Sequence, residues 1–90
     1  MSVKVNIAPF LTHLTADHEL VEVNGGTVGQ CLDGLVEEYP GIREWLFAKN
    51  GKLNNVIEIY VNAESSYPDE LTKPVNDGDE LQIVIMIVGG

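Results

Sequence analysis

The chain has 90 residues, of which 44% are hydrophobic, so it has room for one small domain with a packed core. Five basic and fourteen acidic residues give a net charge of −9, and nucleic acid is therefore not expected as a partner, because its phosphates would be repelled. The single cysteine, Cys31, excludes an internal disulfide framework and a multi-cysteine metal cluster, and it fits a reducing cytoplasm.

The N-terminal segment predicts a strand rather than a targeting signal. Met1–Asn6 lacks the apolar core of a signal peptide, and no apolar run in the sequence is long enough to span a bilayer. We therefore expect a soluble, cytoplasmic protein with no membrane partner. Val3, Val5 and Ile7 alternate with polar residues, which predicts a half-buried strand over residues 3–8.

The next segments predict a loop and a second strand. Residues 10–17 have no clear period and are expected to form a loop or turn. Alternation from Glu19 to Val23 then predicts a strand that stops at Asn24-Gly25-Gly26. Because only a short segment separates them, the first two strands are expected to form a hairpin.

A helix is predicted from Thr27 to Tyr39. Thr27 and Gln30 have the spacing of a capping box, in which a hydroxyl and an amide side chain satisfy free backbone groups at a helix start. Pro40-Gly41 ends the helix. Its apolar face comprises Val28, Leu32, Leu35, Val36 and Tyr39. We expect Leu32, Leu35 and Val36 to pack against a set of strand residues, namely Val5, Ile7, Ile59, Val61, Leu81 and Ile83.

Three further elements are expected before the last strand. Residues 42–47 are predicted to form a short helical turn that covers the core with Trp45 or Leu46. Alternation over residues 56–61 predicts a strand with Ile57, Ile59 and Val61 inside. Residues 63–74 lack a period and are expected to hold a loop and a short edge strand near 71–73.

The chain finishes with a turn, a strand and two glycines. Asp77-Gly78-Asp79 has the chemistry of a tight turn, and the apolar alternation from Leu81 to Val88 predicts a strand. Gly89-Gly90 follows it. Such an ending is either a frayed terminus or a tip without side chains that can enter a narrow site on another protein.

The order strand, strand, helix, strand, short strand, strand predicts an α+β domain in which one main helix covers a mixed sheet of four to five strands. Several short motifs also resemble the ThiS/MoaD group of ubiquitin-like sulfur carriers. The resemblance implies a β-grasp fold for residues 1–90 as one domain with a flexible Gly-Gly tail. The motifs that carry it are Gly25–Leu35, Tyr39–Arg43, Gly51–Leu53, Ile59–Asn62, Asp77–Glu80 and Gly89-Gly90.

The resemblance also implies a function at the C-terminus. In such carriers an ATP-dependent, ubiquitin-activating-type enzyme adenylates the terminal carboxylate, which would be that of Gly90. Sulfur from a persulfide then displaces AMP, and the thiocarboxylate delivers sulfur to an acceptor such as a molybdopterin-synthase large subunit. The protein would be a co-substrate rather than an enzyme, with no bound cofactor, since the partner uses the ATP. The tail that the partner recognises would comprise Met86, Ile87, Val88 and Gly89.

Two alternatives stay open beside the carrier, for which a molybdopterin-type acceptor is favoured over thiazole, cysteine or another. One is the small subunit of a stable molybdopterin-synthase-type complex, and the other is a ubiquitin-like modifier joined to lysine through Gly90. No other residues suggest catalysis. His13 and His18 lack a nucleophilic partner and metal-ligand spacing, so surface positions are expected, and Cys31 is expected to be a buried, inert thiol.

Overall fold

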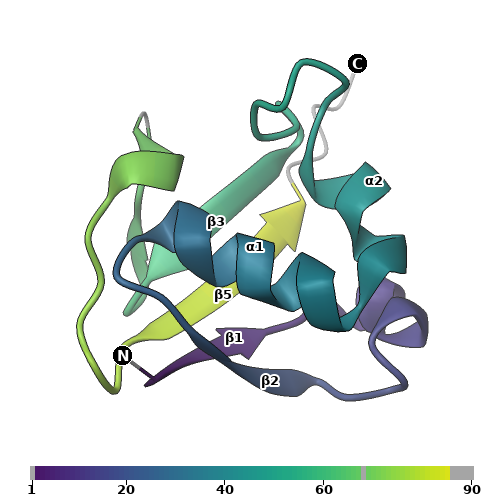
Figure 1. The fold of residues 1–90 in the computed structure, drawn as a ribbon, viewed down its shortest axis with the longest axis horizontal. Coiled ribbons are helices and arrows are strands. Elements are labelled where there is room, and N and C mark those ends of the chain that lie inside the picture. Colours follow the sequence, from purple (N-terminus) through teal and green to yellow (C-terminus); the bar gives the residue numbers. More distant parts are fainter. Residues whose placement is uncertain (1, 68, 86–90) are drawn as a thin grey trace.

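The structure, a computed structural model, describes residues 2–67 and 69–85. Within these residues the chain forms five strands, two α-helices and three short 3₁₀ helices (Figure 1). In chain order they are β1 (Ser2–Asn6), η1 (Pro9–Leu14), β2 (Leu20–Asn24), α1 (Val28–Glu38), η2 (Pro40–Ile42), α2 (Arg43–Leu46), β3 (Ile57–Val61), β4 (Glu64–Ser65), η3 (Glu70–Thr72) and β5 (Glu80–Ile85).

The five strands form one mixed sheet in the order β2-β1-β5-β3-β4. The last strand therefore lies in the middle of the sheet. It pairs in parallel with β1, where Val5 lies beside Leu81, and antiparallel with β3, where Ile59 lies opposite Ile83. The α+β class and the mixed sheet predicted from the sequence are confirmed.

The core lies between the sheet and α1, which crosses one face of the sheet (Figure 1). Alternate strand residues point into it, as the period of two requires. Leu32 and Leu35 of α1 are completely buried in the same cluster, as predicted, whereas Val36 and Tyr39 are only partly buried at its margin. The six strand residues expected opposite the helix, Val5, Ile7, Ile59, Val61, Leu81 and Ile83, all belong to this core.

The predicted capping box sets the start of α1. Thr27 is the N-cap, and its hydroxyl oxygen accepts a hydrogen bond from the backbone N–H of Gln30 at 3.1 Å. The side-chain oxygen of Gln30 accepts one from the backbone N–H of Gly26 at 2.8 Å. The two side chains thus provide acceptors for two backbone N–H groups at the start of α1, and Tyr39 is the C-cap at its end.

The edge strand was predicted in the wrong place. Residues 70–72 form the 3₁₀ helix η3, and the edge of the sheet is instead the two-residue strand β4. A two-residue turn brings β4 back along β3, with Val61 opposite Glu64. Asn62 and Ala63 in this turn have φ values of 50° and 70°, the left-handed pair that a tight hairpin of this length needs.

The segment after β1 also differs from its prediction as a loop. Pro9 occupies the first turn of η1, where its missing N–H costs no hydrogen bond, and Leu11 of this helix is buried. In the short helix α2, Leu46 is buried and covers the core, while Trp45 is exposed.

Most strand boundaries lie within two residues of those predicted. The first strand is shorter than the predicted 3–8, and the third begins at Ile57 rather than Val56. For the last strand, β5 ends at Ile85, and the predicted extension to Val88 lies outside the described residues. None of the helices in the described part of the chain has the length and hydrophobicity that crossing a membrane requires.

Candidate functional site

The turn before β5 fixes where the last strand begins. Gly78 has a φ of +86°, the left-handed conformation that glycine adopts without strain. Its backbone N–H donates to the carbonyl oxygen of Ser2 at 2.8 Å, and the N–H of Ser2 donates to the Asp77 carboxylate at 2.8 Å. The turn is therefore tied to the first residue of β1.

Asn62, at the end of β3, holds the first residues of the β5 segment. Its side-chain N–H donates to the Asp79 carboxylate at 3.0 Å, and its side-chain oxygen accepts from the backbone N–H of Glu80 at 3.0 Å. The hydrogen bond from Asn62, followed by one from the backbone N–H of Asn76, holds the pKa of Asp79 below its ordinary value. These contacts set both the register and the direction of β5.

The far end of β5, after which the tail of the sequence follows, pairs with the start of β3. Val84 lies opposite Glu58, and Ile85 lies opposite Ile57 at the start of β3. Ile85 is half-buried and packs against the core. The strand is thus paired on both sides as far as Gln82, and its last described residues are held by β3 alone.

The residues predicted to carry the function come directly after this strand. Gly90, the predicted reacting residue, and the predicted recognition residues Met86, Ile87, Val88 and Gly89 all lie outside the described residues. Their roles therefore stay predictions. What the structure provides is the element that leads to them, the central strand β5.

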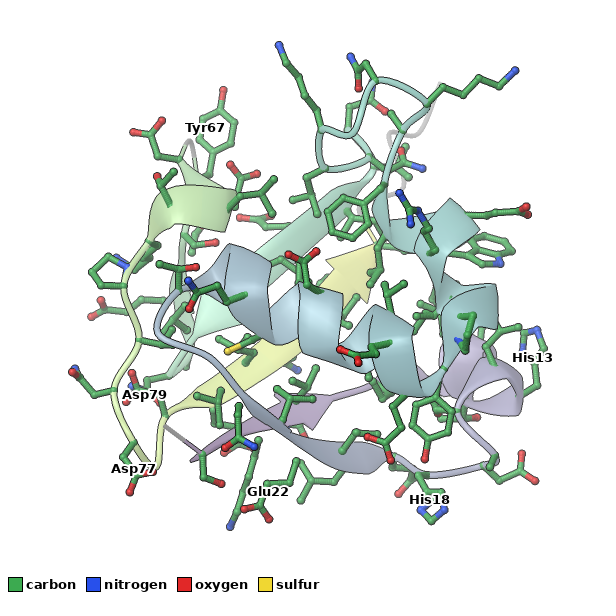
Figure 2. The ribbon with its side chains drawn as sticks, viewed as in Figure 1. His13, His18, Glu22, Tyr67, Asp77 and Asp79 are labelled. Atoms are coloured by element: carbon green, nitrogen blue, oxygen red, sulfur yellow. The ribbon has the colours of Figure 1, made fainter. Side chains whose placement is uncertain are left out.

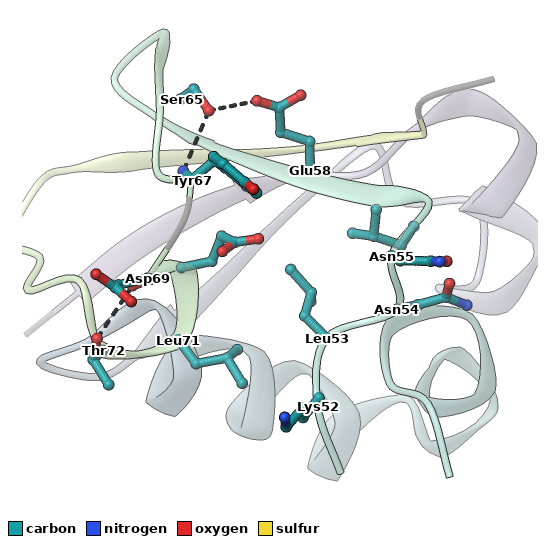
Figure 3. A pocket seen from close by; sticks show the side chains of 12 residues that line it. Lys52, Leu53, Asn54, Asn55, Glu58, Ser65, Tyr67, Asp69, Leu71 and Thr72 are labelled. Carbon is teal, nitrogen blue, oxygen red and sulfur yellow. Dashed lines mark hydrogen bonds between the residues drawn. The ribbon is translucent and has the colours of Figure 1, made fainter. Parts of the chain in front are cut away.

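A groove of about 800 Å³ opens between residues 52–55 and residues 65–72 (Figure 3). Leu53, Ile57 and Leu71 give it an apolar floor, and Glu58 and Asp69 stand along it, with the Glu58 carboxylate accepting a hydrogen bond from Ser65. Neither histidine nor cysteine is among the described residues that line it. The described lining of the groove therefore places carboxylates beside hydroxyl groups, without the histidine base or the thiol that would activate or replace a hydroxyl nucleophile.

The remaining candidate groups are dispersed. His13 and His18 are both exposed, and Figure 2 shows them at the opposite end of the molecule from Asp77 and Asp79. Glu37 and Glu38 are exposed on α1, and Asp69 and Glu70 line the groove. Within residues 2–67 and 69–85, no group of three or more histidine, cysteine or acidic side chains is placed to hold a metal ion.

Cys31 is completely buried in the core under α1, as predicted. Burial raises the pKa of its thiol, because the surrounding apolar side chains disfavour the charged thiolate. A thiolate is the form that attacks a persulfide, so the position of Cys31 favours a structural role.

One surface feature was missed by the sequence interpretation. Phe10 of η1 and Trp45 of α2 are far apart in the sequence, but their rings meet edge to face with centroids 6.0 Å apart and planes at 69°. Both side chains are nearly half exposed. The sequence pattern around these two residues does not predict their contact, because this contact depends on how two short helices meet at one end of the sheet.

Known proteins share this fold along the whole chain. "Sulfur carrier protein CysO" of Mycobacterium tuberculosis is 33% identical over 93 residues, covering 100% of both chains. "Small archaeal modifier protein 1" of Haloferax volcanii is 35% identical over 71 residues, covering 78% of each. The crystal structure of an Amycolatopsis orientalis BexX/CysO complex holds a chain with a TM-score of 0.85 and 34% identity, and the match covers 98% of this chain and 99% of that one.

The family model agrees with these individual similarities. It matches residues 5–90, a range that runs from the first strand through the Gly-Gly at positions 89 and 90. The ubiquitin-like β-grasp fold predicted from the sequence is thereby confirmed. This chain belongs to the ThiS family, among the ubiquitin-like sulfur carriers of the ThiS/MoaD type.

Proposed function

We propose that this protein carries sulfur as a thiocarboxylate on Gly90, after an ATP-dependent, ubiquitin-activating-type enzyme has adenylated the Gly90 carboxylate. The single observation that carries the proposal is the match of residues 5–90 to the ThiS family, which extends to Gly90. The position of β5 supports it, because the strand is paired with β1 at its start and with β3 from Leu81 to Ile85, which gives a firm base to a tail that a partner must bind.

The chemistry explains why a partner enzyme is needed. A terminal carboxylate has a pKa of about 3.5, so it is ionised at neutral pH and is a poor electrophile. In the proposed first step, a Gly90 carboxylate oxygen attacks the α-phosphorus of ATP and pyrophosphate leaves. The terminal sulfur of a persulfide then attacks the carbonyl carbon and AMP leaves. A thiol reductant cleaves the resulting S–S bond, so that the thiocarboxylate remains on Gly90 and a disulfide is formed.

In this scheme the Gly90 carboxylate of the carrier is the substrate, and the catalytic residues belong to the partner enzymes. The dispersed positions of His13, His18 and the acidic residues of α1 are compatible with that division. The solved complex of a CysO with BexX supports a second partner, which would accept the sulfur. The molybdopterin acceptor favoured at first gains no support from the CysO relatives, and we propose only an acceptor enzyme that takes a thiocarboxylate.

A second candidate function is that of a protein modifier. The similarity to a small archaeal modifier protein favours it. The same adenylated Gly90 would then react with a lysine amine of a target protein, and AMP would leave as an isopeptide bond forms. The two functions share the activation step and differ only in the nucleophile that follows.

The decisive experiment is a reaction with the activating enzyme of the same organism, ATP and a persulfide donor, followed by mass spectrometry. The protein should gain the mass that corresponds to replacing one oxygen by sulfur, located at Gly90. A variant extended by one residue beyond Gly90 should not react, since its Gly90 carboxylate is an amide. Sulfur found on Cys31, or normal delivery by a variant without Gly90, would contradict the proposal.

Cell extracts separate the two candidates. The carrier function predicts thiocarboxylate without a ladder of higher-mass conjugates. A modifier would instead give an isopeptide between Gly90 and a lysine, visible after tryptic digestion as a remnant on the target. Such conjugates in the absence of any thiocarboxylate would replace the first function by the second.

A further inference from the structure

Four of the five large exposed hydrophobic side chains in the described residues, Phe10, Leu20, Trp45 and Val56, lie near one end of the sheet. The fifth, Tyr67, lies beside the groove at the β4 edge. Leu20 lies opposite Asn6, the last residue of β1, and Phe10 follows β1 shortly afterwards in η1. Val56 directly precedes β3, whose first residue lies opposite Ile85. Because β1 and β5 are parallel, this is also the end at which β5 finishes.

Phe10 and Trp45 are the two of these side chains whose rings contact each other. Their side chains are 46% and 44% exposed, so both leave large apolar surfaces in contact with water. Covering these surfaces with a partner would be favourable. Their edge-to-face contact restrains both rings, so little further side-chain freedom is lost when a partner covers them. Exposed, restrained aromatic side chains are typical of the residues that dominate the binding energy of protein interfaces.

Backbone hydrogen bonds fix the pair relative to the end of β5. The carbonyl oxygen of Leu46, next to Trp45, accepts from the N–H of Asn54 at 2.8 Å. The carbonyl oxygen of Asn54 accepts from the N–H of Ile57 at 2.9 Å, and Ile57 pairs with Ile85. A partner that contacts Trp45 is therefore held at a set distance from the residue after which the tail begins.

We propose that Phe10 and Trp45 form the docking surface for the activating enzyme, which contacts them through an apolar pocket beside the channel that takes residues 86–90. The inference rests on the proposed function, since it needs a partner that takes the tail. The end of β5 supports this occupant, because Ile85 lies at this end of the sheet and directly precedes residues 86–90, which the proposed function assigns to the activating enzyme.

Trp45 is the only tryptophan of the chain, and it can therefore carry a single fluorine label. The protein prepared with 5-fluorotryptophan should show one ¹⁹F resonance that shifts or broadens on addition of the activating enzyme. A resonance that is unchanged at enzyme concentrations that support adenylation would overturn the proposal. A shift that appears with increasing protein concentration alone would identify a second copy as the occupant, and this result would overturn it as well.

Substitutions test the contribution of the pair to binding. Phe10→Ser and Trp45→Ser should each raise the KM for the carrier about tenfold or more in ATP–pyrophosphate exchange, with kcat little changed. Tyr67→Ser is the matched control, because Tyr67 is also an exposed aromatic residue but lines the groove beyond β3, at the β4 edge. Trp45→Phe should restore most of the binding, which shows that the loss is not caused by misfolding.

The outcomes separate this inference from the proposed function. If wild-type protein is adenylated and the serine variants, with unchanged melting temperatures, have the KM of wild type, the docking surface is wrong while the carrier function stands. If the serine variants and the Tyr67 control lose binding equally, the effect is not specific to the pair, and the inference fails. If wild-type protein is not adenylated at all, the proposed function fails and the docking surface fails with it.

Discussion

The Asn62 side chain binds two consecutive residues at the start of β5, donating to the Asp79 carboxylate and accepting from the backbone N–H of Glu80, each at 3.0 Å. One asparagine side chain thus joins the end of β3 to the start of the central strand. Its φ of 50° is available to asparagine at lower cost than to most residues, so the turn conformation and the side-chain contacts favour the same amino acid.

This contact predicts a pH dependence of stability. The pKa of Asp79 is lowered from its ordinary value of 3.8, chiefly by the Asn62 hydrogen bond. A carboxyl group with a lowered pKa in the folded state stabilises the fold above its unfolded pKa, and this contribution is lost as the pH falls from about 4 through the folded value. Asn62→Gly, which keeps the turn possible, should move the pKa of Asp79 back up and make the loss of stability below pH 4 shallower.

NMR titration of the Asp79 carboxyl, together with urea denaturation at several pH values, measures both effects. Asn55→Gly is a suitable control, since Asn55 is exposed in the segment before β3 and no hydrogen bond joins its side chain to Asp79. An Asp79 pKa that is the same in wild type and Asn62→Gly would contradict the assignment of the cause.

Leu35→Ala tests the core. Leu35 is completely buried between α1 and the sheet, so its truncation leaves a cavity and should lower the free energy of unfolding by roughly 2 to 5 kcal/mol. The exposed Glu37 on the same helix offers a control, and Glu37→Ala should change it by less than about 0.5 kcal/mol. Equal denaturation midpoints for the two variants would refute the described packing of α1.

Two glycines of α1 should respond to alanine with opposite signs. A Cβ at Gly34 would lie 3.7 Å from its nearest neighbours, which is ordinary contact, so Gly34→Ala should stabilise the helix by up to about 1 kcal/mol. A Cβ at Gly29 would lie 2.7 Å from the carbonyl oxygen of Leu71, and this backbone clash outweighs the gain in helix propensity.

Thermal unfolding of both alanine variants provides the measurement. The melting temperature should rise for Gly34→Ala and fall for Gly29→Ala. A rise for both would mean that η3 lies farther from α1 than the structure places it.

Cys31 should react slowly in the folded protein. Burial blocks access to the thiol and raises its pKa, so at neutral pH even less of it is present as the reactive thiolate. Labelling with an aromatic disulfide should therefore be slow without denaturant and fast in urea. Cys31→Ala should retain sulfur transfer to Gly90, and loss of transfer by a folded Cys31→Ala variant would give the thiol a role in the reaction.

The elements that could be predicted from the sequence are those determined by local patterns. The capping box of Thr27 and Gln30 identified the start of α1, and the alternation around Ile59 identified a strand with its buried face. The place of β4 could not be predicted in this way, because it depends on a turn in which Ala63 adopts a positive φ that alanine rarely takes.

The candidate functional residues also include some that the sequence predicts and some that only the fold reveals. Gly90 was predicted from its position in the sequence and from the resemblance to a family, and neither depends on the fold. The pairing of Phe10 with Trp45 depends on where η1 and α2 meet after the sheet has formed. No periodicity within either segment contains that information, since η1 has only six residues and α2 only four.

The parallel pairing of β1 with β5 also determines how the protein can be handled. Ser2 lies beside the Gly78 turn, at the opposite end of the sheet from Ile85 (Figure 1). An affinity tag, a fusion partner or a surface tether joined ahead of Ser2 is therefore held on the side away from the tail. Immobilisation through the N-terminus should thus leave the Ile85 end of the sheet accessible to partner enzymes.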